Sequence, residues 1–266
     1  MLPFGHGSWL RFGSPGMAHE HLHELRKHEL DEALRGFPSI RLGQAAPRVL
    51  ELGAGTGYQA LQLEQLGYKV TAVDLPSSAY AVARVFEVID FDGRHLPFGD
   101  GTFDVVFSSN VLEHVADLDN ILAEIRRVLA PGGVAIHVLP TPTWRAWTTL
   151  AHLPWVVKRV VSHLRARQPL VARPATGTGR SAWRDLVPSR HGERGNVLTE
   201  MLYFSRTWWR KQFAAASFKL VSDRPAGIFY TGCSIFGGAW GMDVRRRHSG
   251  WLGSACRIYE MAATEQ

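Results

Sequence analysis

Residues 49–57 read VLELGAGTG, a short apolar run that ends in three glycines at alternate positions. The run predicts a buried strand, and Gly53, Gly55 and Gly57 let the backbone turn sharply at its end. Because these positions carry no Cβ, a ligand can lie directly across the turn. The helix predicted next, at 58–66, points the positive end of its dipole at that ligand. The stretch therefore predicts the nucleotide-binding turn of an α/β fold.

The alternation of strand and helix continues after this turn. Such alternation is typical of a doubly wound, mostly parallel sheet with helices on both faces, and ligands bind at the carboxyl ends of its strands. With the strand at 48–52, the predicted strands number seven. The others lie at 69–74, 87–91, 103–109, 134–139, 218–222 and 256–261, and further helices are predicted at 18–35, 77–84, 118–129 and 207–216.

Four segments follow from this pattern. Residues 1–46 are expected to form an N-terminal helical segment, and 47–140 the core that binds the cofactor. The proline-rich residues 141–204 interrupt the alternation after the fifth strand and predict an inserted cap or substrate lid. Residues 205–266 are expected to complete the sheet with a helix and the last strands.

The bulk composition narrows the protein class. The chain has 266 residues, 45% of them hydrophobic, which suits one large domain with a packed core. No apolar run is long enough to span a membrane, and the N-terminus lacks the pattern of a secretory signal. Cys233 and Cys256 form no C-x-x-C pair, so free thiols in a cytoplasmic protein are expected, with a single disulfide as the alternative.

Asp74 closes the second predicted strand, 19 residues after Gly55. A carboxylate there can accept hydrogen bonds from both hydroxyls of a ribose, which many adenosine ligands present. Residues 55–60, GTGYQA, also satisfy the dinucleotide fingerprint G-x-G-x-x-A, so an NAD-dependent oxidoreductase is one alternative. A purely structural alternative is that Asp74 caps the helix predicted after it.

Two stretches resemble the class I S-adenosylmethionine-dependent methyltransferases. Glu51 with the three glycines is similar to their E/D-x-G-x-G-x-G pattern. Residues 90–115, DFDGRHLPFGDGTFDVVFSSNVLEHV, resemble the D-x-x-x-L-P-F and F-D-x-V pattern of the type-11 group. The resemblance implies a Rossmann-like methyltransferase fold with S-adenosylmethionine as its cofactor.

The resemblance also implies particular contacts with that cofactor. Glu51 is expected to hold the glycine turn or to interact indirectly with the methionine end, and Asn110 to contact the methionine part. Asp92 is expected to accept from the adenine amino group while the Gly93 amide meets a ring nitrogen. The expected cofactor-binding residues are Glu51, Gly53, Ala54, Gly55, Gly57, Asp74, Leu75, Asp92, Gly93 and Asn110.

Two histidines are candidates for catalysis. His114 follows the fourth strand, where it is either a general base or a helix-start residue packed against the sheet. His191, in SRHGERGN at 189–196, either binds or deprotonates the acceptor or belongs to a solvated turn. The histidines of HEHLH at 19–23 have helical spacing, but no further ligand accompanies them, so no metal site is expected.

The acceptor is less constrained than the cofactor. An oxygen or nitrogen atom of a small molecule or saccharide is expected, and the absence of a basic stripe with interleaved aromatics argues against nucleic acid. Residues 146–165 mix Trp, aliphatic and basic residues, which predicts either a lid or a peripheral contact with a membrane. A non-catalytic binding subunit is a further alternative, against which the intact glycine turn argues. The sequence fixes no oligomeric state.

Overall fold

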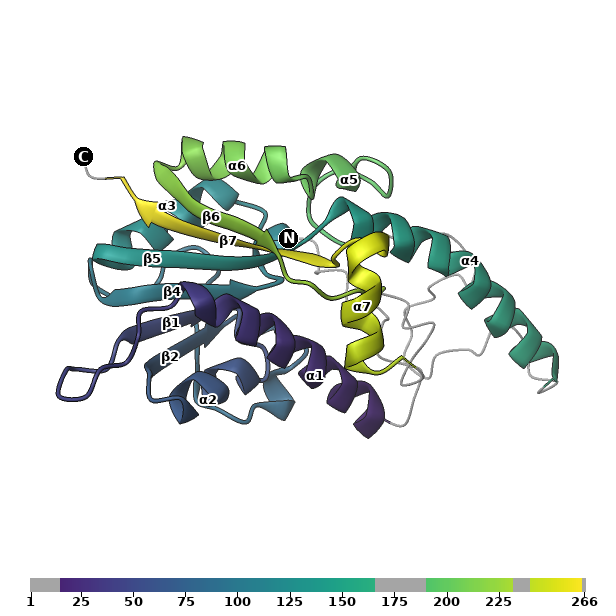
Figure 1. Ribbon diagram of the computed structural model, residues 1–266, viewed down its shortest axis with the longest axis horizontal. Coiled ribbons are helices and arrows are strands. Elements are labelled where there is room, and N and C mark those ends of the chain that lie inside the picture. Colours follow the sequence, from purple (N-terminus) through teal and green to yellow (C-terminus); the bar gives the residue numbers. More distant parts are fainter. Residues whose placement is uncertain (1–14, 166–189, 232–239, 265–266) are drawn as a thin grey trace.

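The computed structural model describes residues 15–165, 190–231 and 240–264. Its centre is a seven-stranded sheet in the order β3-β2-β1-β4-β5-β7-β6 (Figure 1). The first five strands are parallel, and β7 runs antiparallel to both β5 and β6. The predicted doubly wound, mostly parallel sheet is thus confirmed. The strands are β1 (Arg48–Leu52), β2 (Lys69–Asp74), β3 (Val88–Asp90), β4 (Phe103–Ser109), β5 (Leu129–Pro140), β6 (Phe218–Pro225) and β7 (Cys256–Ala263).

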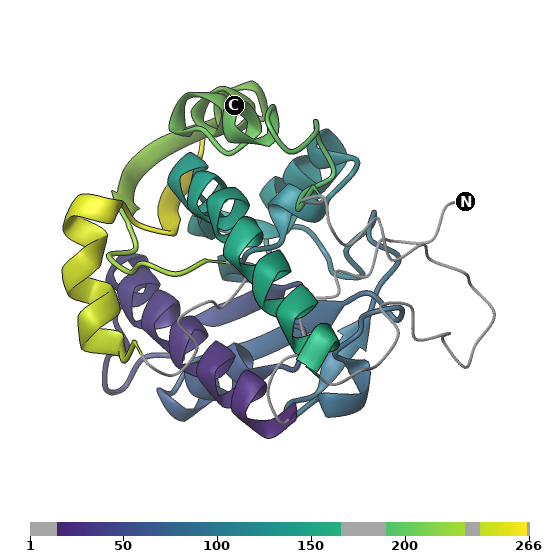
Figure 2. The same cartoon turned by 90° about the vertical axis from the view of Figure 1, so that its right-hand side faces the viewer.

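Helices cover both faces of the sheet. Buried residues of α1 (Pro15–Ala33) and α2 (Tyr58–Gln65) pack on one face, and those of α3 (Leu118–Val128) and α6 (Arg206–Ala215) on the other. Figure 2 looks onto the carboxyl ends of the parallel strands and shows α4 crossing in front of them. The remaining helices are α4 (Pro142–Arg165), α5 (Glu200–Tyr203) and α7 (Met242–Leu252), with short 3₁₀ turns at Leu34–Gly36, Ala81–Ala83 and Leu112–His114.

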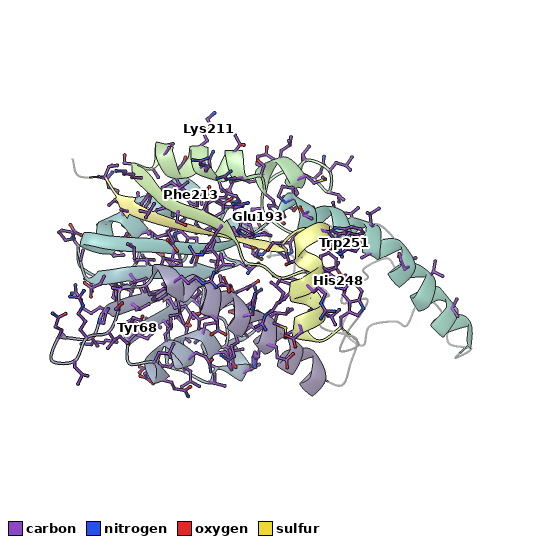
Figure 3. The ribbon with its side chains drawn as sticks, in the orientation of Figure 1. Tyr68, Glu193, Lys211, Phe213, His248 and Trp251 are labelled. Atoms are coloured by element: carbon purple, nitrogen blue, oxygen red, sulfur yellow. The ribbon has the colours of Figure 1, made fainter. Side chains whose placement is uncertain are left out.

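Successive residues of β5 supply the two cores. Ile136 and Val138 are fully buried in the core beneath α1, whereas Leu139 is buried in the core beneath α3 and α6. The helix α6 has one apolar and one polar face. Phe213 lies between the helix and the sheet, whereas Lys211 points away into solvent (Figure 3). Because successive side chains of a strand point to opposite faces of the sheet, β5 contributes to the core on each side.

The helix predicted at 77–84 is wrong. Only the 3₁₀ turn at 81–83 forms there, preceded by a turn in which the Ser78 amide donates to the Leu75 carbonyl. The Ser78 hydroxyl also accepts from the Tyr80 amide. Such local bonds compete with an α-helix, so a serine-rich segment directly after a strand stays in turns.

The end of α3 also differs from the prediction. The helix ends at Val128, and β5 begins at once with Leu129, ahead of the predicted start at 134, so that the Pro-Gly pair Pro131 and Gly132 lies inside the strand. Gly132 has a φ of 76°, and the pairing with β4 shifts register in this region. The Pro-Gly pair thus forms an irregularity within the strand. A separate difference is the helix α7, which was not among the predicted helices.

Residues 146–165 belong to one helix, α4, which contains Pro154. Among the described residues, no helix has the length and apolarity needed to cross a bilayer. Cys256 is a buried free thiol, as predicted. Cys233 and the Gly-rich stretch at 175–181 lie outside the described residues.

Candidate active site

The glycine turn after β1 has the left-handed backbone that its sequence predicts. Gly53, Gly55 and Gly57 have φ values of 72°, 58° and 75°. A Cβ on Gly53 would lie 2.5 Å from Val111, and one on Gly57 would lie 2.6 Å from Phe86. Both positions therefore require glycine for close packing.

Asp74 organises this turn from the end of β2. Its Oδ2 accepts a hydrogen bond of 2.9 Å from the Gly55 amide, and its Oδ1 accepts one of 2.7 Å from the Leu75 amide. The carboxylate thus braces the glycine turn with one oxygen and its own strand end with the other.

Glu51 lies behind the turn. Its side chain is buried, and the amide of Ala60 donates to its carboxylate. Burial is the main cause that raises the pKa of Glu51 to about 8, with a smaller contribution from the charge of Asp74. Glu51 therefore contacts the start of α2.

A cavity of about 760 Å³ opens at the carboxyl ends of the strands. Of the ten residues expected to bind the cofactor, Glu51 and Gly57 are absent from its lining. Both histidines proposed for catalysis, His114 and His191, do line it. The structure therefore brings the two predicted groups together in one space. The expected cofactor residues that line the cavity are Gly53, Ala54, Gly55, Asp74, Leu75, Asp92, Gly93 and Asn110.

Asp92 is held in place by its own loop. Its Oδ1 accepts hydrogen bonds of 2.8 Å from the amides of Arg94 and His95, and these bonds lower its pKa. Gly93 has a φ of 78°, and a Cβ there would lie 2.9 Å from the Leu75 side chain. The loop therefore presents an ionised carboxylate and a glycine amide at the edge of the cavity.

A buried network joins α1 to this site, and the sequence analysis missed it. Arg26 donates to Glu29 at 2.5 Å, and the Tyr230 hydroxyl donates to the same carboxylate at 2.7 Å. Asn110 donates to Glu29 at 3.3 Å and accepts from the Cys256 thiol at 3.5 Å. Its members come from distant parts of the chain, so no local spacing indicates them.

Within this network, Glu29 is ionised although it is fully buried. Burial alone would raise its pKa, but the charge of Arg26 and the hydrogen bond from Tyr230 lower it. The pKa of Arg26 is raised in turn by Glu29. The Arg26 side chain keeps 26% exposure and lines the cavity, so a guanidinium is part of the cavity wall.

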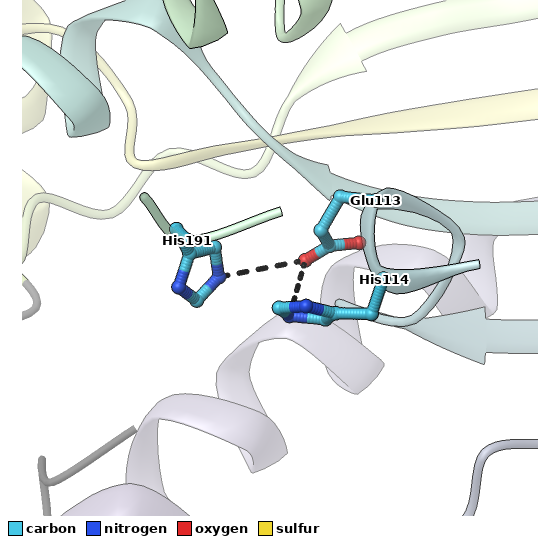
Figure 4. A group of neighbouring side chains, drawn as sticks. All are labelled: Glu113, His114 and His191. Carbon is cyan, nitrogen blue, oxygen red and sulfur yellow. Dashed lines mark ion pairs between the residues drawn. The ribbon is translucent and has the colours of Figure 1, made fainter. Parts of the chain in front are cut away.

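Glu113, His114 and His191 lie close together, and the two histidines line the cavity (Figure 4). One oxygen of Glu113 lies 3.8 Å from Nε2 of His114 and 3.9 Å from Nε2 of His191. The Glu113 side chain has no exposure, whereas His114 keeps 41% and His191 21%. His114 thus faces the cavity instead of packing against the sheet.

Burial also sets the charge of this cluster. It raises the pKa of Glu113 to about 8 and lowers the pKa of His114. The pKa of His191 is lowered by burial first, then by the neighbouring His114 and Arg145. Both imidazoles are therefore neutral at pH 7 and carry a lone pair.

Hydrogen bonds to Glu200 fix the loop at 190–193, which carries His191. Glu200 accepts hydrogen bonds from the amides of His191 (2.5 Å) and Gly192 (2.7 Å). The same carboxylate lies 3.0 Å from Nε of Arg145 on α4, and both side chains are almost fully buried. The His191 ring packs on Trp144 with centroids 4.6 Å apart.

Comparison with known proteins matches residues 50–137 to the family model described as "Methyltransferase domain". The demethylmenaquinone methyltransferase of Thermobifida fusca is 31% identical over a 169-residue alignment, and the match covers 52% of this chain and 72% of that protein. The malonyl-[acyl-carrier protein] O-methyltransferase of Serratia marcescens is 34% identical over 114 residues, covering 41% and 44% of the two chains. This chain thus spans less than half of the second relative.

A solved structure extends the likeness to the fold. A chain of the complex between the Haloferax volcanii Trm112 methyltransferase activator and a methyltransferase superposes with a TM-score of 0.56. The match covers 94% of this chain and 95% of that chain at 19% identity. At this identity the match shows a shared architecture.

Proposed function

We propose an acceptor class for this chain, which belongs to the type-11 group of the class I S-adenosylmethionine-dependent methyltransferases. S-adenosylmethionine is the cofactor of this family. The reaction we propose is transfer of its methyl group to an oxygen atom of a small-molecule or saccharide acceptor. One observation carries this proposal: the neutral imidazoles of His114 and His191 line the same cavity as the glycine turn and Asp74.

We propose one orientation for the cofactor in this cavity. Asp74 would bind the ribose hydroxyls, and Asp92 with the Gly93 amide would bind the adenine edge. Asn110 and the glycine turn would hold the methionine part, whose carboxylate Arg26 would neutralise. The methyl group would then point toward His114 and His191.

The residues of the chain must position the acceptor and accept its proton. The sulfonium of S-adenosylmethionine already activates the methyl group, so the protein must position the acceptor in line and exclude water. A hydroxyl must lose its proton as its oxygen bonds to the methyl carbon and the C–S electron pair returns to sulfur. His114 or His191 can take up that proton because each is neutral. An acceptor amine, which loses its proton in the same way, is the second candidate.

The names of the relatives support an acceptor from biosynthesis but do not agree on one chemical class. Their names refer to a malonyl-acyl-carrier protein and to a demethylmenaquinone, two chemically different biosynthetic molecules. We propose that the segment after β5 selects the acceptor, because α4 and the loop at 190–193 supply Trp144 and His191 to the cavity.

Transfer of a labelled methyl group from S-adenosylmethionine tests this proposal. The panel contains phenols, saccharides, amines and carboxylic thioesters, and the labelled product is analysed by mass spectrometry. We expect label on a hydroxyl oxygen. We also expect a fall in kcat of at least about 100-fold in His114→Gln or His191→Gln. His248→Gln, on α7, is the control. Label on carbon alone, or full activity in both variants, would contradict the proposal.

A peripheral membrane contact belongs to the same proposal. Leu150 and Val157 of α4 are 57% and 62% exposed, which suits an interfacial helix. Binding to anionic vesicles in a flotation assay tests it, with Leu150→Ser/Val157→Ser as the variant. Absence of wild-type binding would leave α4 as a lid over the acceptor.

A further inference from the structure

We propose that Glu113, His114 and His191 bind a divalent transition-metal ion at the acceptor end of the cavity. The three side chains come from two distant segments of the chain and converge on one point (Figure 4). Two imidazole nitrogens and one carboxylate oxygen form a ligand set that suits Zn²⁺, Fe²⁺, Co²⁺ or Mn²⁺.

The distances favour shared coordination over direct hydrogen bonds. The separations of 3.8 and 3.9 Å between the Glu113 oxygen and the two Nε2 atoms exceed hydrogen-bond length. Two ligands of one tetrahedral zinc ion lie about 3.4 Å apart. All three ligand atoms lie within 4.8 Å of one another, so small rotations of the two rings suffice to close the site.

Glu113 supplies an independent observation. Its side chain has no exposure, and neither of its carboxylate oxygens has a hydrogen-bond partner in another described residue. A buried carboxyl group without partners is costly in a folded protein. An ion between the two rings would give this carboxylate its missing partner.

A second histidine–carboxylate pair serves as a comparison, because its two side chains are in direct contact. His95 and Glu124 are 2.9 Å apart, and the His95 side chain is 69% exposed. That pair is an ordinary surface contact at hydrogen-bond distance. Glu113 instead stands at nearly equal and longer distances from two rings, one of which Glu200 fixes through the loop amides.

The position of the ion gives it a role in the proposed reaction, and this step rests on the proposed function. His114 and His191 both line the cavity, so the remaining coordination positions would face the acceptor. With the ion bound, both imidazoles are its ligands, so water replaces them as the proton acceptor. An acceptor hydroxyl bound to the ion would release its proton to water, because the ion stabilises the alkoxide. The oxygen would then bond to the methyl carbon as the C–S electron pair returns to sulfur.

Metal binding tests the site without any activity. The tag-free, full-length chain is dialysed against EDTA and titrated separately with Zn²⁺ and Mn²⁺, and bound metal is counted by mass spectrometry. We expect one ion per chain, bound at least about tenfold more weakly in Glu113→Gln and in His191→Gln. His95→Gln is the matched control, and binding of S-adenosylhomocysteine by every variant verifies folding.

A double variant, His19→Gln/His23→Gln, separates this site from the histidine-rich start of α1. Unchanged binding in that variant supports the proposal. Loss of the ion there, full binding in Glu113→Gln and His191→Gln, or no stoichiometric ion in the wild type would overturn it.

Loading the site with Co²⁺ tests the proposed catalytic role of the ion separately from metal binding itself. A change in the visible absorption of the Co²⁺-loaded chain on addition of a methylated hydroxyl acceptor places that acceptor on the ion. Metal binding without hydroxyl methylation would overturn the proposed function and leave the site. Hydroxyl methylation at an unchanged rate in EDTA would overturn the catalytic role of the ion.

Discussion

At the scale of single residues, Asp74 connects the cofactor turn to the sheet. Because its two oxygens hold the Gly55 and Leu75 amides, Asp74→Ala removes the brace of the turn and, with it, the ribose contact that we propose. We expect the affinity for S-adenosylmethionine and S-adenosylhomocysteine to fall at least about tenfold, or about 1.4 kcal/mol, in calorimetric titration. Asp90→Ala is the control, since Asp90 is paired in register with Asp74 on β3. Equal losses in the two variants would contradict this role.

Glu51 predicts a dependence of stability on pH. Its pKa in the folded chain, about 8, lies above the ordinary value of 4.5. Between these values the unfolded chain loses a proton that the folded chain keeps. The contribution of Glu51 therefore falls as pH rises from about 4.5 to about 8 and stays low above that. We expect Glu51→Gln to be more stable than wild type at pH 8 by roughly 1–3 kcal/mol, with little difference at pH 4.5.

Chemical denaturation at the two pH values measures this effect. The exposed Glu64 of α2 provides the control, Glu64→Gln, which should follow wild type at both. A Glu51→Gln variant that gains no stability at pH 8 would show that the carboxylate is better compensated than its burial implies.

At the scale of elements, Glu200 fastens the His191 loop to α4. Glu200→Gln keeps the size of the side chain but removes the buried charge opposite Arg145. We expect a loss of about 3–5 kcal/mol in the free energy of unfolding, as for other buried pairs that lose one partner. We also expect a lower kcat with unchanged affinity for S-adenosylhomocysteine. Glu193→Gln breaks an exposed pair in the same loop and should cost at most about 1 kcal/mol.

The elements also show what the sequence could predict. β1, β2 and β4 have the bounds that the sequence predicts, because each contains a short apolar run followed by residues that favour a turn. The helix at 77–84 failed because serine side chains satisfy the local amides. The helix α7 was missed because its buried residue is Arg245, so no apolar stripe marks it.

The candidate site also contains residues that the sequence could predict and residues that it could not. Most of the residues predicted to bind the cofactor line one cavity because they follow neighbouring strands, whose carboxyl ends meet at one edge of the sheet. Glu29 and Tyr230 meet only through tertiary packing, as do Glu113 and His191. The expectation of no metal considered the histidines at 19–23 alone, and the site we propose departs from it.

At the scale of the whole molecule, one cavity joins residues from α1 to the segment after β6. A ligand that fills it binds the folded chain alone and must stabilise all these elements together. We expect S-adenosylhomocysteine at 100 times its Kd to raise the free energy of unfolding by about 2.7 kcal/mol in chemical denaturation. NAD at the same concentration should have no effect. Equal stabilisation by NAD would support an oxidoreductase instead.

The place of β7 has a consequence for biosynthesis. This strand follows β5 and β6 in the chain but lies between them in the sheet. While residues 256–263 are still inside the ribosome, the facing edges of β5 and β6 have no partner and are open to pairing with other chains. The emerging polypeptide can therefore complete its sheet only after residues 256–263 have left the ribosome, and until then those two edges are open to aggregation.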